Sequence, residues 1–517
     1  MLFSSIEFIY AFLPVTLTIF FLCYNLFGRN FSILILCISS LFFYGYWKPE
    51  YVFLLIGSIV TNYFFGKIIN TSRSYKKKIL VIGIIFNILL LGYFKYSDFI
   101  VFNLNSFILH DVSFEEVILP LAISFFTFQQ ISYLVDSYKS ETSKHNFLEY
   151  FLFVVFFPQL IAGPIVQQKF ALKQYTKKNF GKFNLSKLLF GISLFVLGLF
   201  KKVFIADHLN LFSSNLFNSV ANGYNPLFFE AWIGSFCYMF QLYFDFSGYC
   251  DMALGLGLMF GIVLPINFNS PYKSLSIIEF WRRWHISLSD FLKDYIYKPI
   301  RGFIQKDSLL NLKNPRQILS FIMFPIMITF FISGFWHGAG YTFILWGIYH
   351  GLLVFVNQVF KVLNKEYHII NMNQLFMKII SFLITTLSVN FGWVLFRSDS
   401  ISSSLVIFKS MLGVNGVQMT PRLIENFPIF KKIFSYPPTG FGWLGNFNSE
   451  VFVMLSISIM IIYFFSNNME NFNFINKNNK KCFNLSFSNG VFVTFLLILS
   501  TSIFWTNITV DFLYFSF

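Results

Sequence analysis

Residues 318–360 read ILSFIMFPIMITFFISGFWHGAGYTFILWGIYHGLLVFVNQVF and contain no Asp, Glu, Lys or Arg. Apolar runs cover 318–335 and 341–360, and each is long enough to cross a bilayer core of about 30 Å as a helix. Between them lies His337, among glycines and aromatics. A titratable ring at membrane depth costs free energy unless it faces protein or water, so His337 is a candidate functional residue. A structural histidine bonded to a backbone carbonyl is the alternative.

The rest of the chain shares this apolar character. Of its 517 residues, 56% are hydrophobic, 22% aromatic and only 12% charged. Soluble domains carry about 25% charged residues. No polar region is large enough to fold as a separate soluble domain. We therefore predict an all-α polytopic membrane protein with a single membrane domain over 1–517.

Apolar stretches that could span the membrane recur from end to end, and we expect about eleven to thirteen transmembrane helices. The candidates lie near 8–27, 31–48, 51–70, 79–98, 117–136, 147–166, 186–206, 228–264, 318–335, 341–360, 376–396, 450–466 and 489–506. The stretch 228–264 is too long for one upright crossing and contains polar residues. A tilted helix, a broken helix and two re-entrant halves all remain open for it.

The net charge of +15 sits mostly in short loops, at 73–78, 169–187 and 477–481. This pattern indicates attraction to anionic lipid headgroups on the cytoplasmic side and no nucleic-acid partner. If 73–78 is cytoplasmic, the positive-inside rule places both termini outside, together with the loop region 397–449 and the tail 507–517. The N-terminal segment lacks a basic n-region and a cleavage site, which favours a retained first span.

The residues suited to metal or nucleophile chemistry do not occur in the usual spacings. The five cysteines are scattered, without metal-ligand spacing, so we expect neither a disulfide framework nor a metal site. His285 and His337 lack HxxxH spacing, and no Gly-x-Ser-x-Gly elbow occurs. A histidine that acts as general base on a hydroxyl of another group requires the fewest assumptions.

Two carboxylates interrupt the apolar run 241–252, which reads QLYFDFSGYCDM. Asp245 and Asp251 should therefore face protein or water. As buried structural acids, they would pair most readily with the cations of the next polar segment.

That segment, 279–295, reads EFWRRWHISLSDFLKDY. At 100° per residue one helical face would carry Trp281, His285, Leu288 and Leu292, and another would carry Arg282, Ser289 and Lys293. An amphipathic, aromatic-flanked helix at the headgroup level is the general interpretation. The more specific one makes His285 a second active-site imidazole and Arg282 or Arg283 the contact for an anionic carrier.

Six segments of the sequence together resemble those of a known enzyme family. The segments are 1–5 (MLFSS), 157–165 (FPQLIAGPI), 245–252 (DFSGYCDM), 267–272 (NFNSPY), 281–291 (WRRWHISLSDF) and 334–339 (GFWHGA). Together they resemble the membrane-bound O-acyltransferases, and in particular the bacterial branch that acetylates alginate or peptidoglycan and D-alanylates teichoic acid.

The resemblance implies a ring of membrane helices around a thinned centre, with an external funnel and a cytoplasmic tunnel. It makes His337 the catalytic histidine and His285 its companion. Further candidate substrate or donor contacts are Arg282, Arg283, Trp336, Asp245, Tyr249, Asp251 and Asn269. The protein would lie in the bacterial inner membrane without a tightly bound cofactor. Acetyl-CoA or another acyl thioester would be the cytoplasmic donor, and a polysaccharide and a periplasmic acetyltransferase would be the external partners.

The C-terminal tail ends DFLYFSF, at 511–517. It resembles the tyrosine-bearing motif of the small companion peptide in the D-alanylation system. That likeness implies that Tyr514 accepts the acyl group and passes it on. A tethered phenol has a high effective concentration, and a phenyl ester remains an activated acyl donor. An aromatic anchor at the membrane interface is the alternative.

The expected function is therefore export-coupled O-acetylation of peptidoglycan or an exopolysaccharide. D-alanyl transfer to teichoic acid is the enzymatic alternative. A channel or transporter for a small anionic solute is the alternative from another class, with the histidines and arginines lining its pathway. The chain shows no inverted repeat, which argues against a transporter.

Overall fold

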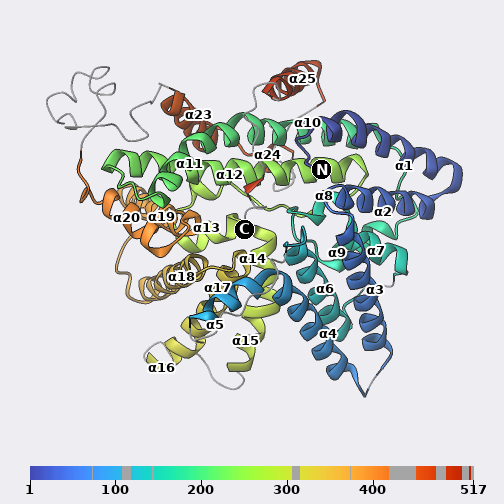
Figure 1. Ribbon diagram of the computed structural model, residues 1–517, viewed down its shortest axis with the longest axis horizontal. Helices are drawn as coiled ribbons and strands as arrows, with labels where there is room; N and C mark the ends of the chain where they lie inside the picture. Colours follow the sequence, from blue (N-terminus) through green and yellow to red (C-terminus); the bar gives the residue numbers. More distant parts are fainter. Residues whose placement is uncertain are drawn as a thin grey trace. The chain divides into compact units, whose positions relative to one another are not determined.

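The computed structural model describes residues 1–72, 74–106, 118–142, 145–304, 315–372, 374–417, 450–472, 485–503 and 512–513. Every regular element in these ranges is a helix, which confirms the expected all-helical architecture (Figure 1). Tyr514 and the larger part of the expected loop region 397–449 lie outside the described residues.

Eight helices of the described chain are long and apolar enough to cross a membrane, and all eight overlap stretches expected from the sequence. They run over Phe8–Phe27, Glu50–Thr71, Lys76–Asn105, Leu185–Ala221, Leu319–His337, Tyr341–Tyr367, Leu375–Arg397 and Glu450–Glu470. Three shorter apolar helices accompany them: α2 (Arg29–Gly45), α20 (Ile401–Met411) and α25 (Phe487–Ser502). The chain is thus a multi-pass membrane protein.

The chain divides into two compact units that alternate along the sequence. Unit 1 comprises 1–199, 248–266 and 483–499, and unit 2 comprises 200–247, 267–482 and 500–517. The expectation of one domain over 1–517 stays a prediction.

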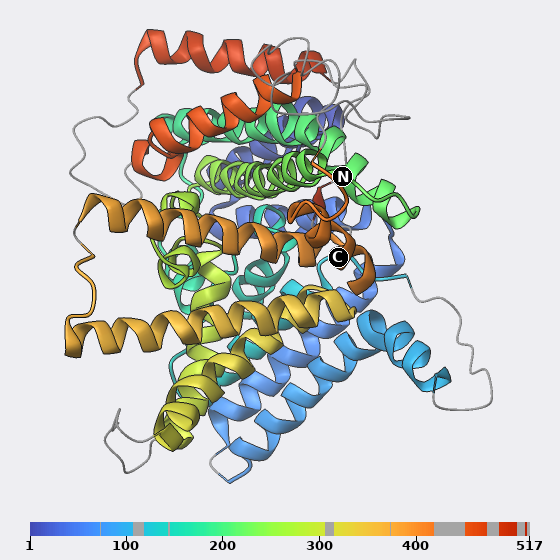
Figure 2. The same cartoon turned by 90° about the vertical axis from the view of Figure 1, so that its left-hand side faces the viewer.

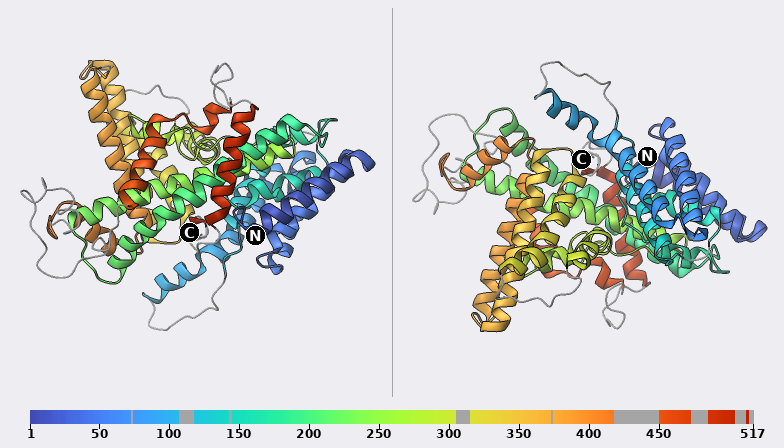
Figure 3. Two further views of the ribbon diagram at one scale, coloured as in Figure 1. Left: turned by 90° about the horizontal axis from the view of Figure 1, so that it is seen from above. Right: turned by 90° about the horizontal axis from the view of Figure 1, so that it is seen from below.

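Unit 1 is built mainly from N-terminal helices. These are α1 (Leu13–Phe27), α2, α3 (Glu50–Thr71), α4 (Lys76–Leu91), α5 (Ser97–Asn105), α6 (Ile123–Tyr138), α7 (Phe147–Val155), α8 (Phe157–Leu160), α9 (Gln168–Tyr175) and α10 (Leu185–Phe200). Helices α1 and α2 pack against each other (Figure 3). Between α3 and α4, the buried amides of Asn62 and Asn87 exchange hydrogen bonds of 3.2 and 2.7 Å. Such polar pairs hold helices together where lipid offers no hydrophobic driving force.

The expected span at 147–166 is wrong, because the helix ends early. Helix α7 stops at Val155, the four-residue α8 follows, and 161–167 form no helix. Pro158 lies in the first turn of α8, where its missing N–H costs no helical hydrogen bond. At the start of α7, the Glu149 carboxylate accepts from the backbone N–H of Asn146. The same carboxylate pairs with Arg29 at 3.0 Å.

Helix α12 (Phe228–Met259) is unbroken over 32 residues. The broken and re-entrant alternatives for 228–264 are therefore wrong. At 1.5 Å per residue its length of about 48 Å exceeds the hydrocarbon thickness. Its first part, with Asp245, belongs to unit 2, and its second part, with Asp251, belongs to unit 1.

Besides the first part of α12, unit 2 contains the helices that follow α10, except α25, most of which belongs to unit 1. These are α11 (Asp207–Ala221), α13 (Ile277–Arg283), α14 (Ile286–Leu292), α15 (Lys298–Ile304), α16 (Pro315–Ile318), α17 (Phe324–His337), α18 (Tyr341–Tyr367), α19 (Leu375–Arg397), α20, α23 (Glu450–Phe464) and α24 (Asn468–Asn471). Figure 2 shows α18 and α19 as long neighbouring helices, and they are in contact.

Glycines let α17 and α18 approach closely. A Cβ on Gly334 would lie 3.0 Å from the Cα of Gly347, and a Cβ on Gly347 would collide with the carbonyl oxygen of Phe330. Small residues allow such backbone contact between membrane helices. The close approach fixes the end of α17, where His337 lies, against the first turns of α18.

Candidate active site

The amphipathic segment 279–295 is not one continuous helix, so the expected helical face shared by Trp281 and His285 is wrong. Helix α13 ends at Arg283 and α14 begins at Ile286. Between them His285 takes a left-handed conformation with φ 44° and ψ 54°. Non-glycine residues take this conformation at a cost, and such strain gathers at functional sites. The break gives His285 an orientation that a continuous helix could not.

Asn267 holds this break in place. Its backbone carbonyl accepts from the N–H of Ile286 at 2.9 Å. Its side-chain Oδ1 accepts from the N–H of Ser287 at 3.1 Å and from the Ser287 hydroxyl at 2.7 Å. Because a backbone N–H can only donate, the atom that faces Ser287 must be the amide oxygen.

The same Oδ1 lies 3.2 Å from Nδ1 of His285. Since Oδ1 can only accept, Nδ1 carries the ring proton and Nε2 is the acceptor atom of the neutral ring. Burial lowers the pKa of His285 to about 3, because the charged imidazolium would lose its hydration. A neutral ring in this tautomer can accept a hydrogen bond at Nε2, but it is a weak base and has no free N–H for an oxyanion.

His337 is the last residue of α17 and is buried. Aromatic rings surround its imidazole, with the Trp336 centroid at 4.7 Å, Trp346 at 5.1 Å and Phe396 at 5.2 Å. It lines a cavity of only about 10 Å³, whose wall includes Phe246. That volume is about one water molecule, so the site is nearly dry.

The two imidazoles share neighbours from two elements, α17 and α12. The ring of Trp336 contacts His337 and lies 6.4 Å from the ring of His285. Phe246 of α12 lies 4.8 Å from His285, edge-on, and also lines the His337 cavity. The structure therefore brings His285, His337 and Trp336, predicted separately from the sequence, into one site.

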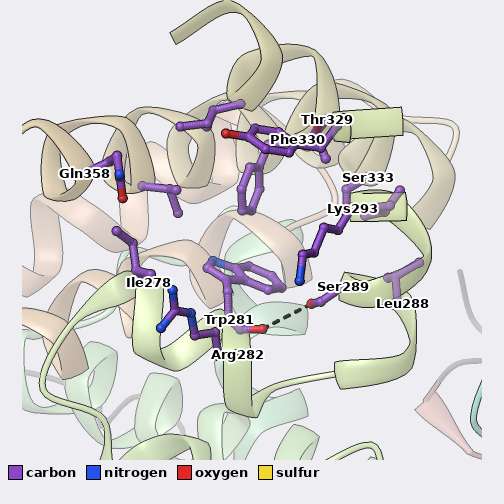
Figure 4. Close-up of a pocket in the computed structure, with 14 residues that line it drawn as sticks. Ile278, Trp281, Arg282, Leu288, Ser289, Lys293, Thr329, Phe330, Ser333 and Gln358 are labelled. Atoms are coloured by element: carbon purple, nitrogen blue, oxygen red, sulfur yellow. Dashed lines mark hydrogen bonds between the residues drawn. The ribbon is translucent and has the colours of Figure 1, made fainter. Parts of the chain in front are cut away.

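A larger cavity of about 270 Å³ lies in the same unit (Figure 4). The residues that line it are Ile278, Trp281, Arg282, Leu288, Ser289, Leu292, Lys293, Tyr297, Ile326, Thr329, Phe330, Ser333, Val354 and Gln358. They include two cations and no acid, which makes the cavity suited to an anion with an apolar part. Figure 4 shows the Lys293 side chain extending toward Trp281, beside which Arg282 lies.

Four tryptophans link the walls of these two cavities through ring contacts. We call Trp281, Trp284, Trp346 and Trp393 the tryptophan cluster. Trp281 lines the larger cavity and the other three line the smaller one. The Trp281 ring packs on Trp346 at 5.7 Å. The buried indole N–H of Trp281 has no hydrogen-bond partner among the described residues.

The two adjacent arginines take different roles. Arg282 lines the larger cavity, whereas Arg283 pairs with Glu279 at 2.7 Å and donates to the carbonyl of Asn269 at 3.3 Å. Asn269 itself accepts from Asn467 at 3.1 Å, so it connects its loop to the start of α24. Of the two arginines, the structure thus favours Arg282 as the contact for an anion.

The two aspartates of α12, Asp245 and Asp251, lie in different units. Asp245 pairs with Lys202 at 2.7 Å, so the expectation that its cation would come from 279–295 is wrong. Asp251 and Tyr249 are buried in unit 1, where Tyr249 stacks on Phe3 at 4.8 Å. Tyr514 lies outside the described residues.

Sequence reasoning missed Asn267 and Lys202. Asn267 stands in the segment NFNSPY, but Asn269 was preferred there, and only the spatial contact with His285 separates the two. Lys202 lies in an apolar run that reads as a membrane span. The two adjacent lysines in this run, Lys201 and Lys202, were an available signal, because a cation at membrane depth requires a partner. Among the described residues, no group of three or more His, Cys, Asp or Glu side chains gathers as metal ligands would.

These features define a class of protein: a multi-pass helical chain in which the buried His285 and His337 lie at a nearly dry site, with a larger cationic cavity in the same unit. The model of MBOAT, the membrane-bound O-acyltransferase family, matches residues 114–394. That match covers more than half of the chain. The chain belongs to this family and is a membrane-bound O-acyltransferase.

Its relatives include three named enzymes. The chain is 43% identical over 448 residues to the peptidoglycan O-acetyltransferase of Helicobacter pylori, covering 81% of each chain. It is 36% identical over 428 residues to the probable alginate O-acetylase AlgI of Pseudomonas aeruginosa, covering 81% of this chain and 76% of the relative. It is 30% identical over 286 residues to the teichoic acid D-alanyltransferase of Bacillus subtilis, covering 53% and 68%.

Asn267→Ala should lower the rate of acyl transfer about 10²-fold, because the His285 ring loses the contact that fixes its tautomer and orientation. Asn267→Asp keeps an acceptor and should retain more activity. The comparison variant is Asn269→Ala, which removes an amide from the same loop without touching His285. Single-turnover rates of the purified variants measure the effect. Equal losses in Asn267→Ala and Asn269→Ala would show that the loop, and not the His285 contact, matters.

Proposed function

We propose that this enzyme transfers an acetyl group from a cytoplasmic thioester to a hydroxyl on the outer side of the bacterial inner membrane, with peptidoglycan as the final acceptor. The observation that carries the proposal is the 43% identity to a peptidoglycan O-acetyltransferase over 81% of both chains. The alginate relative is less similar, and the D-alanyl relative matches only about half of this chain.

The chemistry of the larger cavity supports the proposed donor. Arg282 and Lys293 can bind the phosphates of coenzyme A or of a carrier's phosphopantetheine arm. The apolar walls suit the arm itself, and a carbonyl of the arm would satisfy the unpaired N–H of Trp281. Ser333 lines this cavity one helical turn before His337 on α17. A thioester that passes the tryptophan cluster would thus reach the imidazoles.

The chemistry then follows from the positions of the two rings. His337 takes the proton of the attacking hydroxyl, whose oxygen forms a bond to the thioester carbonyl carbon. The tetrahedral intermediate expels the thiolate, which recovers the proton from His337, so ester and free thiol are the products. His285 cannot accept the same proton, because a hydroxyl has only one; its ring lies beside the site, next to Phe246 at 4.8 Å and Trp336 at 6.4 Å. A backbone amide suits the oxyanion better, because the Nδ1 proton of His285 is already bonded to Asn267.

The first acceptor in this proposal is Tyr514. Its phenol would take the acetyl group at the imidazoles and present a phenyl ester on the external side, where a periplasmic acetyltransferase transfers it to the glycan. The tail that carries Tyr514 docks through Phe512 and Leu513 onto α12, next to the ring of Phe246.

Arg282→Ala should raise the KM for acetyl-CoA about tenfold or more, since a charge-assisted contact to the donor is lost. Arg283→Ala is the matched control, because Arg283 pairs with Glu279 on a half-exposed surface and should change KM by no more than about twofold. Initial rates against acetyl-CoA concentration measure both. If Arg283→Ala raises KM as much as Arg282→Ala, the cavity in Figure 4 is not the donor site.

His337→Ala should lower the transfer of labelled acetyl from coenzyme A by about 10² to 10⁴-fold, as expected when a general base is removed. His350→Phe is the matched control. His350 is also a buried histidine in contact with Trp346, at 5.1 Å, but neither of its ring nitrogens has a hydrogen-bond partner among the described residues. It should keep transfer within about tenfold. Solute flux in proteoliposomes without consumption of thioester would instead support a transporter.

Tyr514→Phe removes only the phenolic oxygen and should abolish acetylation of the tail. In the wild type, mass spectrometry after a brief incubation with acetyl-CoA should find one acetyl group, which adds about 42 Da, on the C-terminal peptide. His337→Ala should not acquire it. Transfer to the external acceptor at the wild-type rate by Tyr514→Phe would overturn the relay and favour an aromatic anchor.

A further inference from the structure

The last described residues of the chain are docked inside unit 2. The backbone N–H of Leu513 donates to Oδ2 of Asp245 at 3.0 Å. The preceding side chain, Phe512, is only 2% exposed, and its ring lies 6.0 Å from that of Phe246. Two successive residues of the tail therefore contact two successive residues of α12. An anchor in lipid would leave its ring on the protein surface, whereas Phe512 is enclosed by protein.

The carboxylate that receives the tail is fixed from its other side. Nζ of Lys202 lies 2.7 Å from Oδ1 of Asp245 and 2.7 Å from Oδ1 of Asp207. All three side chains are at most 5% exposed. A buried carboxylate is stabilised by each donor that faces it, so the cluster gains from a further N–H donor. Leu513 supplies such a donor to the carboxylate oxygen that Lys202 does not bind.

Phe246 connects this docking contact with the active site. Its ring touches Phe512 on the tail, lies 4.8 Å from the His285 ring and lines the cavity beside His337. Asp245 and Phe246 are neighbours on a rigid helix, so the hydrogen bond to Asp245 fixes where the tail meets this ring. The docking contact is thus adjacent to both imidazoles without including either.

We propose that Asp245, held by Lys202, is the anchor that positions the C-terminal tail at the active site. Asp245 and Lys202 are positioning residues, because they touch the tail or its anchor and not the reacting atoms. This inference rests on the proposed function in one respect: it assumes that the tail carries the acyl acceptor. The anchoring itself is independent of that chemistry and can be measured without a donor.

The test is hydrogen–deuterium exchange of the C-terminal peptide in the full-length enzyme, in lipid nanodiscs and without donor. Leu513→Pro removes the backbone N–H that donates a hydrogen bond to Asp245. Leu513→Ala removes side-chain atoms and keeps that N–H. We expect the remaining amides of the tail to exchange at least about tenfold faster in Leu513→Pro, and at the wild-type rate in Leu513→Ala. Asp245→Ala removes the acceptor instead and should match Leu513→Pro. Glu230→Gln is the control for an acid on the same helix that bonds Tyr224 and Leu227 instead of the tail.

Kinetics complete the test. Leu513→Pro should lower kcat about tenfold or more and leave the KM for acetyl-CoA unchanged, because a displaced acceptor changes the chemical step and not donor binding. Unchanged exchange in Leu513→Pro overturns the anchor. Faster exchange with unchanged kcat overturns the positioning role. Failure of the proposed function is a separate result, since it would appear as a wild-type enzyme that consumes no acetyl-CoA while the exchange difference persists.

Discussion

The side chain and carbonyl of Asn267 determine most of what is distinctive in this site. Its carbonyl and its Oδ1 together accept from Ile286, Ser287 and His285, and these contacts stabilise a left-handed residue where a helix would otherwise continue. Without the break, His285 would follow the face of Trp281 toward the larger cavity. With it, Trp281 lines that cavity and His285 contacts Phe246 and lies near Trp336. One amide thus separates the proposed donor contacts around Trp281 from His285.

The parts of the fold that the sequence predicted are those governed by local chemistry. Hydropathy located all eight long helices, because a backbone in hydrocarbon must satisfy its own hydrogen bonds and a helix is the way to do so. His337 was predicted because an imidazole is costly at membrane depth. Local pattern failed where a distant residue decides the conformation. The break at His285 depends on Asn267, eighteen positions earlier, and the partner of Asp245 is Lys202 on a different helix.

The same reasoning explains why Arg282 and Arg283 could not be distinguished beforehand. Adjacent residues on a helix point about 100° apart, so only one of them can face a given cavity. Which one does so is set by the position of α13, and Glu279, one turn before Arg283, engages that arginine at 2.7 Å. An acid four residues before a basic residue is a common surface pair.

The tryptophan cluster gives the two cavities different environments, and this difference bears on how a thioester could survive in the membrane. The larger cavity has two cations and a volume of about 270 Å³, which suit the proposed phosphate-bearing donor. The space at His337 is about 10 Å³ and is walled by Trp284, Trp346 and Trp393. Water that reached an activated thioester would hydrolyse it, so a nearly dry chamber favours transfer over hydrolysis. A dry chamber also excludes a dissolved acceptor, which makes an acceptor attached to the protein advantageous. In the proposal, the C-terminal tail is such an attached acceptor, because Leu513 bonds to the Asp245 carboxylate, which Lys202 holds in a buried ion pair on α12.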